Sequence, residues 1–239
     1  LVSRALMLGG GSADAILEDF NGDGASDLAV AVSGANLLSI FFGQSDGSFL
    51  SWPSMNVTLD SEPVDIEVID RYDDGDHQII VLQRKAPPSS EFDNFLLVNL
   101  TSNTTATKST SITLTDGASS VVVANLMGDA AQDIAVVSAR SDPVSEVGVV
   151  EVFQGPSFSF SLQLFSGYGA YSLSCGDFDS DGFPDAAVSC YGADWVAFLG
   201  GSSAGLKQRY SIDVGSGPIH LEKGDFDGDG LPDLAVLGI

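Results

Sequence analysis

The chain has 239 residues, 44% of them apolar, and a formal net charge of −24 from 33 acidic and 9 basic side chains. This length and apolar content are enough for one large all-β domain or two small ones. The basic footprint that nucleic acids and anionic membranes require is missing, and no run of 18 apolar residues predicts a membrane-spanning helix. We therefore expect no nucleic-acid partner and no membrane insertion by this segment. The charge favours carboxylates that hold cations, although a soluble acidic surface gives the same balance.

The first repeat sets the pattern of predicted elements along the chain. The apolar segment at 15–17 predicts a strand, an acidic loop follows at 19–27, and a second strand begins at 28–30. A third strand is predicted at 37–42, and the turn residues at 44–47 lead into a fourth. No stretch shows helical periodicity.

The acidic loop then recurs, eroded in two of its copies. The five copies are named loop 1 (19–27), loop 2 (70–78), loop 3 (125–133), loop 4 (177–185) and loop 5 (225–233). A period of about 50 residues fits four short strands and their turns. Residues 1–239 are therefore predicted to form a single all-β domain or segment. The predicted fold is a β-propeller of four-stranded antiparallel blades with five repeat motifs.

The two ends of the chain do not match whole repeats. The piece from Arg4 to Leu8 resembles the fourth strand of a blade, and the last repeat stops at a second strand ending at Ile239. We expect the chain to be a segment of a longer one, which an intact-mass measurement on the native protein tests.

Loops 1, 4 and 5 follow the pattern Asp-x-Asp/Asn-x-Asp-Gly-x-x-Asp, which favours calcium. Calcium takes roughly six to eight oxygen ligands, which side chains at positions 1, 3, 5 and 9, the position-7 carbonyl and water can supply. Glycine at position 6 permits the positive φ of a tight wrap. A metal-free Asx turn is the alternative, but four close carboxylates repel one another unless a cation lies among them. About three Ca²⁺ sites are predicted, with ligands Asp19, Asn21, Asp23, Ala25 and Asp27; Asp177, Asp179, Asp181, Phe183 and Asp185; and Asp225, Asp227, Asp229, Leu231 and Asp233.

An EF-hand is a poor alternative for these loops, because position 12 is valine inside a strand where an EF-hand requires glutamate. Phe at position 2 is interpreted as a packing residue that anchors the loop to the sheet.

Loops 2 and 3 are degenerate. In loop 3, Met127 replaces the third ligand and Ala130 replaces the glycine, which disfavours calcium. Loop 2 has Tyr72 at position 3 and Gln78 at position 9, and its Asp73, Asp74 and Asp76 are interpreted as out of register, so a surface turn with a solvent-facing His77 is expected.

These residues resemble the FG-GAP/VCBS repeat family, which builds the propeller of integrin α-subunits. The resemblance lies in the loop motif with its apolar flanks, in Gly169-Ala170-Tyr171-Ser172-Leu173 before loop 4, and in Val214-Gly215-Ser216-Gly217-Pro218 before loop 5. It implies calcium that rigidifies the inter-strand loop, on the ring face opposite the ligand-binding surface. It also implies a larger, seven-bladed ring.

Two further features bear on compartment. Three Asn-x-Ser/Thr sequons, at Asn56, Asn99 and Asn103, predict N-glycosylation and an extracellular protein, secreted or at the cell surface. Cys175 and Cys190 flank loop 4 in the two strands that it joins. We expect a disulfide across this hairpin, with two buried free thiols as the alternative.

The sequence thus predicts a non-enzymatic extracellular calcium-binding propeller for adhesion, protein interaction or structural assembly of a filament or matrix. Its partner is expected to be a protein or glycan at a propeller face, or another copy. A lectin-type propeller is one alternative, although we expect blade packing for its candidate aromatic residues, Trp52, Trp195, Tyr168, Tyr171 and Tyr191. The second alternative is the propeller part of a hydrolase or lyase.

Overall fold

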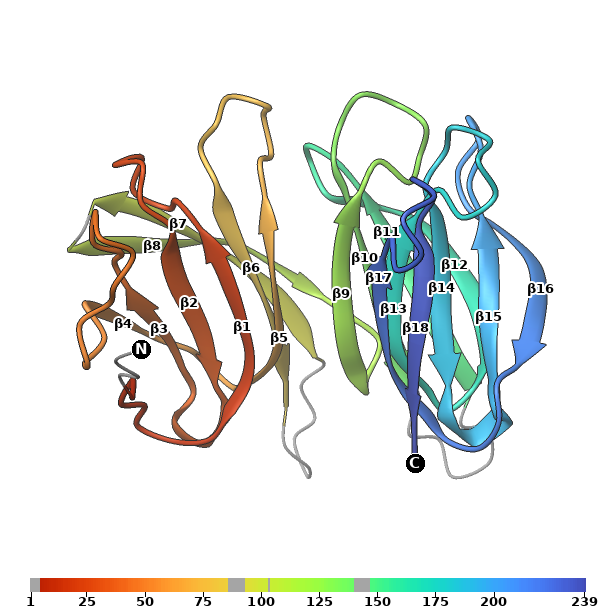
Figure 1. The fold of residues 1–239 in the computed structure, drawn as a ribbon, viewed down its shortest axis with the longest axis horizontal. Helices are drawn as coiled ribbons and strands as arrows, with labels where there is room; N and C mark the ends of the chain where they lie inside the picture. The colour runs from red at the N-terminus through yellow and green to blue at the C-terminus, as the bar shows by residue number, and fades with distance from the viewer. Residues whose placement is uncertain (1–4, 86–92, 103, 140–146) are drawn as a thin grey trace. The chain divides into compact units, whose positions relative to one another are not determined.

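The computed structural model describes residues 5–85, 93–102, 104–139 and 147–239. Antiparallel strands make up most of these residues, and the chain divides into two compact units, Leu1–Leu114 and Thr115–Ile239 (Figure 1). Within the described ranges, no helix is long and apolar enough to cross a membrane. The sequon at Asn103 lies outside the described residues.

The first unit contains two four-stranded sheets, each with its strands in chain order. Sheet 1 comprises β1 (Ser12–Glu18), β2 (Asp27–Val32), β3 (Leu37–Phe41) and β4 (Met55–Thr58), with the short 3₁₀ turn η1 (Ser33–Ala35) between β2 and β3. Sheet 2 comprises β5 (Glu62–Ile69), β6 (Gln78–Arg84), β7 (Asn94–Ser102) and β8 (Thr105–Thr113).

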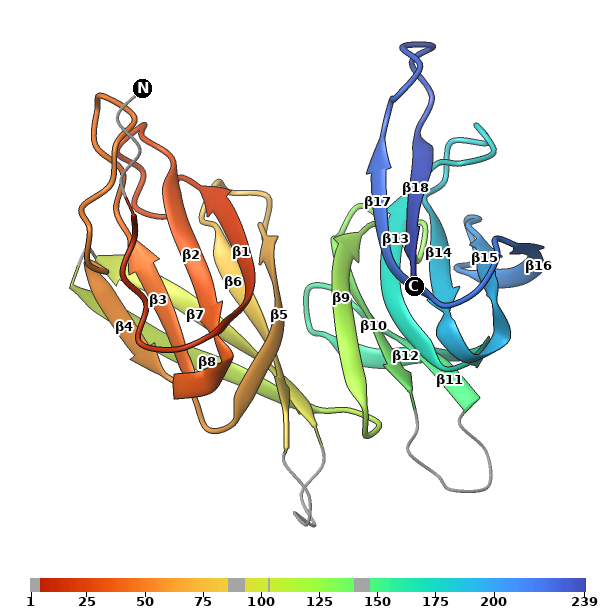
Figure 2. The same ribbon diagram turned by 60° about the horizontal axis from the view of Figure 1, so that its bottom comes forward.

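The second unit contains two more such sheets and one hairpin. Sheet 3 comprises β9 (Ala118–Ala124), β10 (Asp133–Ala139), β11 (Val147–Gln154) and β12 (Ser159–Tyr168). Sheet 4 comprises β13 (Ala170–Gly176), β14 (Asp185–Cys190), β15 (Trp195–Gly200) and β16 (Lys207–Asp213), with the 3₁₀ turn η2 (Tyr191–Ala193) after β14. The hairpin is formed by β17 (Pro218–Gly224) and β18 (Asp233–Gly238), whose connecting loop extends beyond the ends of the strands (Figure 2).

Burial follows strand position within each sheet. The second strands β2, β6, β10 and β14 are buried along almost their whole length and are rich in apolar residues, as strands covered on both faces are. The fourth strands are mostly exposed, and every residue of β16 is exposed. The all-β architecture of four-stranded antiparallel sheets is therefore confirmed.

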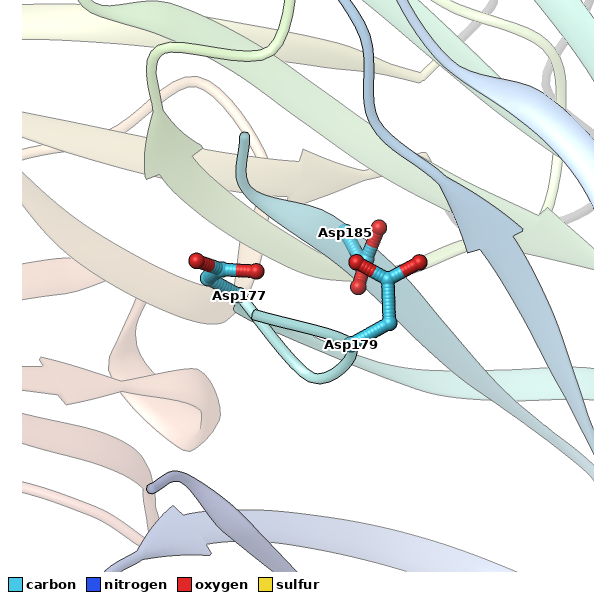
Figure 3. A group of neighbouring side chains, drawn as sticks. All are labelled: Asp177, Asp179 and Asp185. Carbon is cyan, nitrogen blue, oxygen red and sulfur yellow. The ribbon is translucent and has the colours of Figure 1, made fainter. Parts of the chain in front are cut away.

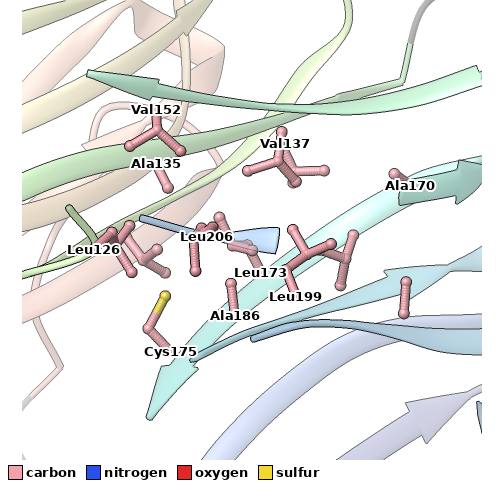
Figure 4. Close-up of a cluster of buried hydrophobic side chains, with 14 of the residues drawn as sticks. Leu126, Ala135, Val137, Val152, Ala170, Leu173, Cys175, Ala186, Leu199 and Leu206 are labelled. Carbon is pink, nitrogen blue, oxygen red and sulfur yellow. The ribbon is translucent and has the colours of Figure 1, made fainter. Parts of the chain in front are cut away.

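Successive sheets within a unit pack face to face. In the first unit one apolar cluster joins Ala29 and Leu38 of sheet 1 to Ile79 and Leu96 of sheet 2. In the second unit another joins Val137 and Val152 of sheet 3 to Leu173 and Leu199 of sheet 4 (Figure 4). Burying one such aliphatic side chain stabilises the fold by roughly 1.5–3 kcal/mol.

All five acidic loops have the same place in their sheets, because each joins a first strand to a second strand. A register irregularity also recurs near the start of every first strand, for example between Ser12 and Asp14 and between Pro63 and Asp65. The local structure thus repeats along with the motif.

The expected disulfide is wrong, because both cysteines are buried and neither is joined in a disulfide. Cys175 lies opposite Ala186 and Cys190 lies opposite Ala170, so the two thiols are at different ends of the β13–β14 ladder. The sequence separation suggested a cross-strand pair, but the hairpin register places other residues opposite each cysteine. Burial raises the pKa of the Cys190 thiol to about 11, which keeps it protonated.

Candidate metal centre

In loops 1, 4 and 5 the side chain of the first aspartate stabilises the turn by accepting hydrogen bonds from backbone N–H groups of its own loop. In loop 1, Asp19 Oδ1 accepts from the Gly22 N–H at 2.8 Å, and Oδ2 accepts from the Gly24 N–H at 2.8 Å. The Gly24 N–H holds the pKa of Asp19 below its ordinary value. The equivalent bonds to glycine N–H groups recur in loop 4 at 2.9 Å and in loop 5 at 3.0 Å. Each of these position-6 glycines has a φ between 85° and 90°, which side chains with a Cβ rarely adopt.

The aspartate at position 9 ties the loop to the sheet. Asp27 is fully buried; its Oδ2 accepts from Phe20 N–H at 3.1 Å and its Oδ1 from Gly43 N–H, beyond β3, at 2.8 Å. Asp185 repeats this with Phe178 at 3.0 Å and Gly201 at 2.7 Å. Burial raises the pKa of both carboxyls, opposed by the N–H groups that donate to them. This residue is therefore a structural clamp as well as a predicted ligand.

Loop 4 brings three of its predicted ligands together. One carboxylate oxygen from each of Asp177, Asp179 and Asp185 lies within 4.8 Å of the others (Figure 3). Two like charges at this separation repel by about 3 kcal/mol at the effective dielectric of a protein surface. An oxygen-only donor set of this kind fits calcium, which prefers hard oxygen ligands in flexible geometry.

An arginine from the outer strand also reaches loop 4. Arg209, on β16, contacts Asp179 through Nη1, lies 3.3 Å from Asp181 Oδ2 through Nη2, and donates to the Gly201 carbonyl at 3.3 Å. The contact with Asp179 raises the pKa of Arg209. Sequence reasoning missed this residue, although an arginine is conspicuous in a chain with nine basic side chains.

Loop 5 gathers a different set of carboxylates. Asp225, Asp227 and Asp229 form a second group with oxygens within 4.8 Å, and all three are exposed. Asp233 accepts from the Phe226 N–H at 2.8 Å. Phe226 is 61% exposed, so the expectation that position 2 packs against the sheet is wrong here, whereas it is confirmed for the buried Phe20.

Loop 1 has the same turn with an amide at position 3. Asn21 Oδ1 accepts from the Asp23 N–H at 2.9 Å, and Asp23 Oδ1 accepts from the Ala25 N–H at 2.9 Å. The position-7 residues Phe183 and Leu231 donate to Asp181 and Asp229 in the same way, at 3.0 and 2.8 Å. All three loops are thus preorganised by one pattern of backbone bonds around their acidic side chains.

Loop 2 keeps more of the motif than the sequence suggested. Asp74 and Gly75 occupy positions 5 and 6, so Asp74 was wrongly interpreted as out of register. Asp70 accepts from the N–H groups of Asp74 and Gly75 at 3.1 and 2.9 Å, and Gly75 has a φ of 83°. His77 does not face solvent fully: its side chain is 29% exposed, and its Nδ1 lies 3.5 Å from Glu18 Oε1.

Loop 3 keeps the buried aspartate at position 9 but lacks the positive-φ glycine at position 6. Asp133 is fully buried and accepts from Leu126, Met127 and Gly155. Ala130, at position 6 of this loop, does not adopt a positive φ. The clamp therefore persists where the predicted cation ligands have been lost.

The remaining predicted residues lie on strands and turns. Asn56 is exposed on β4, and its Oδ1 accepts from Ser39 Oγ at 2.7 Å. Asn99 lies on β7 opposite Gln78, and its Oδ1 is buried. The five aromatic residues expected to pack between blades are instead at least 37% exposed.

Comparison with known proteins identifies the repeat in the C-terminal part of the chain. The model of the FG-GAP-like repeat family matches residues 177–236, which confirms the resemblance for this part of the chain. No curated protein matches the chain significantly.

Several solved structures share the fold. A functionally unknown protein from Desulfotomaculum acetoxidans DSM 771 superposes with a TM-score of 0.67 at 13% identity, over 98% of this chain and 64% of that one. The Dos1 propeller superposes with a TM-score of 0.61 at 12% identity, over 86% of this chain and 48% of that one. Hydrazine synthase from Kuenenia stuttgartiensis superposes with a TM-score of 0.58 at 13% identity, over 92% of this chain and 70% of that one.

These likenesses identify the sheets as blades of a β-propeller and show the fold alone. The chain spans less than two thirds of the length of the first two structures. Because one of the three is by name an enzyme, the fold does not decide between a catalytic and a binding role.

Proposed function

We propose that this chain is an extracellular, calcium-stabilised β-propeller segment that serves protein interaction, in adhesion or in the assembly of a filament or matrix. The observation that carries the proposal is the convergence of carboxylates in loops 4 and 5, on turns already shaped by backbone hydrogen bonds. Loop 1 has the same turn and is the third proposed site. The three sequons support an extracellular location.

Calcium in these loops would act on the scaffold. The position-9 aspartate bonds both the loop and the end of the third strand, so an ion held by positions 1, 3, 5 and 9 would fasten three segments of a blade. It would also offset repulsion within each acidic group. Because only the folded loop presents these ligands together, calcium would stabilise the folded state by mass action.

The proposal is non-enzymatic because the chain offers few candidate catalytic groups. It has two histidines, His77 and His220, and no Gly-x-Ser-x-Gly motif. The aligned aspartates are engaged by the N–H groups of their own loops.

Thermal unfolding with and without chelator tests the proposal. We expect the melting temperature to fall markedly in chelator and to recover with Ca²⁺ but not with an equal concentration of Mg²⁺, which demands stricter octahedral geometry. The variant D19N/D177N/D225N should lose the calcium response. The control D46N/D116N/D213N removes the same charge outside the loops and should keep it. A wild-type melt that is unchanged by chelator contradicts the proposal.

A glycan-binding role is the second candidate, favoured by exposed aromatic rings near η2. Tyr168, Tyr191 and Trp195 are 45%, 47% and 37% exposed. Gly192 lies against the Tyr168 ring, where an added Cβ would be 3.2 Å from Cδ1, and the Tyr191 N–H donates to the Gly169 carbonyl at 2.9 Å. Exposed aromatic faces of this kind suit the apolar faces of sugars.

A glycan-array screen in calcium and in chelator tests the second candidate. We expect binding that Y191A and Y168A abolish, while W52A, which removes an exposed tryptophan of the first unit, leaves it intact. Absence of binding on the array, or equal loss in W52A, contradicts it.

A further inference from the structure

A polar pocket lies between loops 1 and 2, within the first unit. Its volume is about 370 Å³, and its walls include Asp19 and Asn21 of loop 1, Asp76 and Gln78 of loop 2, and Asn99 of β7. This volume is at the small end of the range for ligand pockets, roughly 300–1,000 Å³. The pocket can therefore hold a side chain or a small molecule.

Three buried polar atoms among the pocket residues, His77 Nδ1, Gln78 Oε1 and Asn99 Oδ1, have no hydrogen-bond partner. Gln78 is only 8% exposed, and neither its Oε1 nor the Oδ1 of Asn99 is bonded. Gln78 and Asn99 are direct neighbours across the β6–β7 ladder. A buried acceptor without a donor is costly and is usually satisfied by a ligand or water. With the carboxylate of Asp76 added, which is not among the proposed calcium ligands, the pocket favours a ligand rich in hydrogen-bond donors.

The pocket residues outside loop 1 do not suit a sugar, or a metal ion in addition to the one proposed for loop 1. In the described ranges, the groups of three close carboxylates lie in loops 4 and 5, and none includes the loop 2 residues that line this pocket. The aromatic residue in the walls, Phe20, is 6% exposed and offers no ring face for a sugar to stack on. The walls thus combine amide oxygens, the imidazole Nδ1 of His77 and the negative charge of Asp76, which suits a cation that carries its own N–H donors.

Loop 4 shows that the motif accepts such a cation. There the Arg209 guanidinium lies between Asp179 and Asp181 and also bonds a backbone carbonyl. Asp76 of loop 2, which lines the pocket and is not a proposed calcium ligand, offers the same kind of acceptor to a cation from outside the chain.

We propose that the pocket between loops 1 and 2 binds the ammonium or guanidinium group of a lysine or arginine side chain from a protein partner. The proposal rests on the interaction role proposed above and specifies the chemistry of the partner. It requires an unmodified Asn99, because a glycan on this side chain would fill the pocket. Peptide mass mapping that finds a glycan on Asn99 overturns it.

Peptide titration of the calcium-saturated full chain provides the main test. The probes are the blocked tripeptides Gly-Lys-Gly and Gly-Arg-Gly, with Gly-Gln-Gly as the uncharged match, followed by isothermal calorimetry at low ionic strength. We expect the cationic peptides to bind and the glutamine peptide not to bind. Q78M removes the unpartnered oxygen at similar length, and D76N removes one pocket charge. Each should weaken binding at least fivefold.

D74N is the matched control, because it removes one charge from the same loop at a residue outside the pocket. We expect it to change peptide affinity less than twofold. Equal weakening by D74N and D76N with no effect of Q78M would show diffuse attraction only and overturn the proposal, as would absence of peptide binding or preference for a neutral sugar. Calcium stoichiometry measured on the same samples separates the two proposals. Bound calcium without peptide binding overturns this inference alone, and loss of calcium binding overturns the proposed function.

Discussion

Loops 4 and 5 carry the same motif in one unit, yet their surroundings differ. Loop 4 belongs to a four-stranded sheet, so Asp185 reaches the Gly201 N–H beyond the third strand, and Arg209 of the fourth strand contacts two of its carboxylates. Loop 5 belongs to a two-stranded hairpin, where Phe226 and the three gathered aspartates are exposed. The comparison separates what the motif contributes by itself from what the rest of the blade adds to it.

The largest difference is expected at position 9. Asp185→Ala removes the acceptor of two N–H groups in a buried setting, at about 1–3 kcal/mol for each donor left unpaired. Asp233→Ala, in the open hairpin, should cost less than about 1 kcal/mol. Urea unfolding in calcium-free buffer measures both. Equal losses of stability would show that the third strand contributes nothing to the clamp.

A smaller difference is expected at position 2. Phe178 packs edge-on against Phe198, with ring centroids 6.0 Å apart, whereas Phe226 is largely exposed. Phe178→Ala should lower the free energy of unfolding by about 2 kcal/mol, short of the ~3–5 kcal/mol for a fully buried ring. Phe226→Ala should change it by less than about 0.5 kcal/mol. The denaturant midpoints of the two variants measure this difference in stability. A larger loss of stability in Phe226→Ala than in Phe178→Ala would contradict the comparison.

The smallest effect concerns Arg209, which a calcium ion in loop 4 would have to displace from Asp179 and Asp181. Exposed ion pairs contribute little to stability, so Arg209→Gln should raise the calcium affinity of loop 4 by at most about fivefold. The measurement uses chains in which loop 5 is disabled by D225N/D227N, and Lys207→Gln on the same strand is the control. Unchanged or weaker affinity in Arg209→Gln would show that the guanidinium does not compete with the ion.

The sequence predicted the strands and the loops because both depend on local order along the chain. Alternation and spacing placed each acidic loop between a first and a second strand, and glycine at position 6 marked the positive φ. What it missed depends on register and packing. Arg209 reaches loop 4 from another strand, and Gln78 meets Asn99 only when β6 and β7 pair. The disulfide failed for the same reason, since strand register decides which residues face each other.

The exposed aromatic residues were missed through a different limit. Tyr191 and Trp195 lie at a turn beside a strand start, where sequence alone does not tell whether a neighbouring blade covers them. Burial of the second strands was predictable from their apolar-rich sequences, but the exposure of the fourth strands was not.

Counting calcium ions per chain tests the central claim most directly. Equilibrium dialysis of the wild type is expected to give three bound ions, and D19N, D177N and D225N are each expected to give two. Asp70→Asn, in the degenerate loop 2, should leave the count at three. A wild-type chain that binds no calcium, or one whose count is unchanged by all three loop variants, would contradict the account.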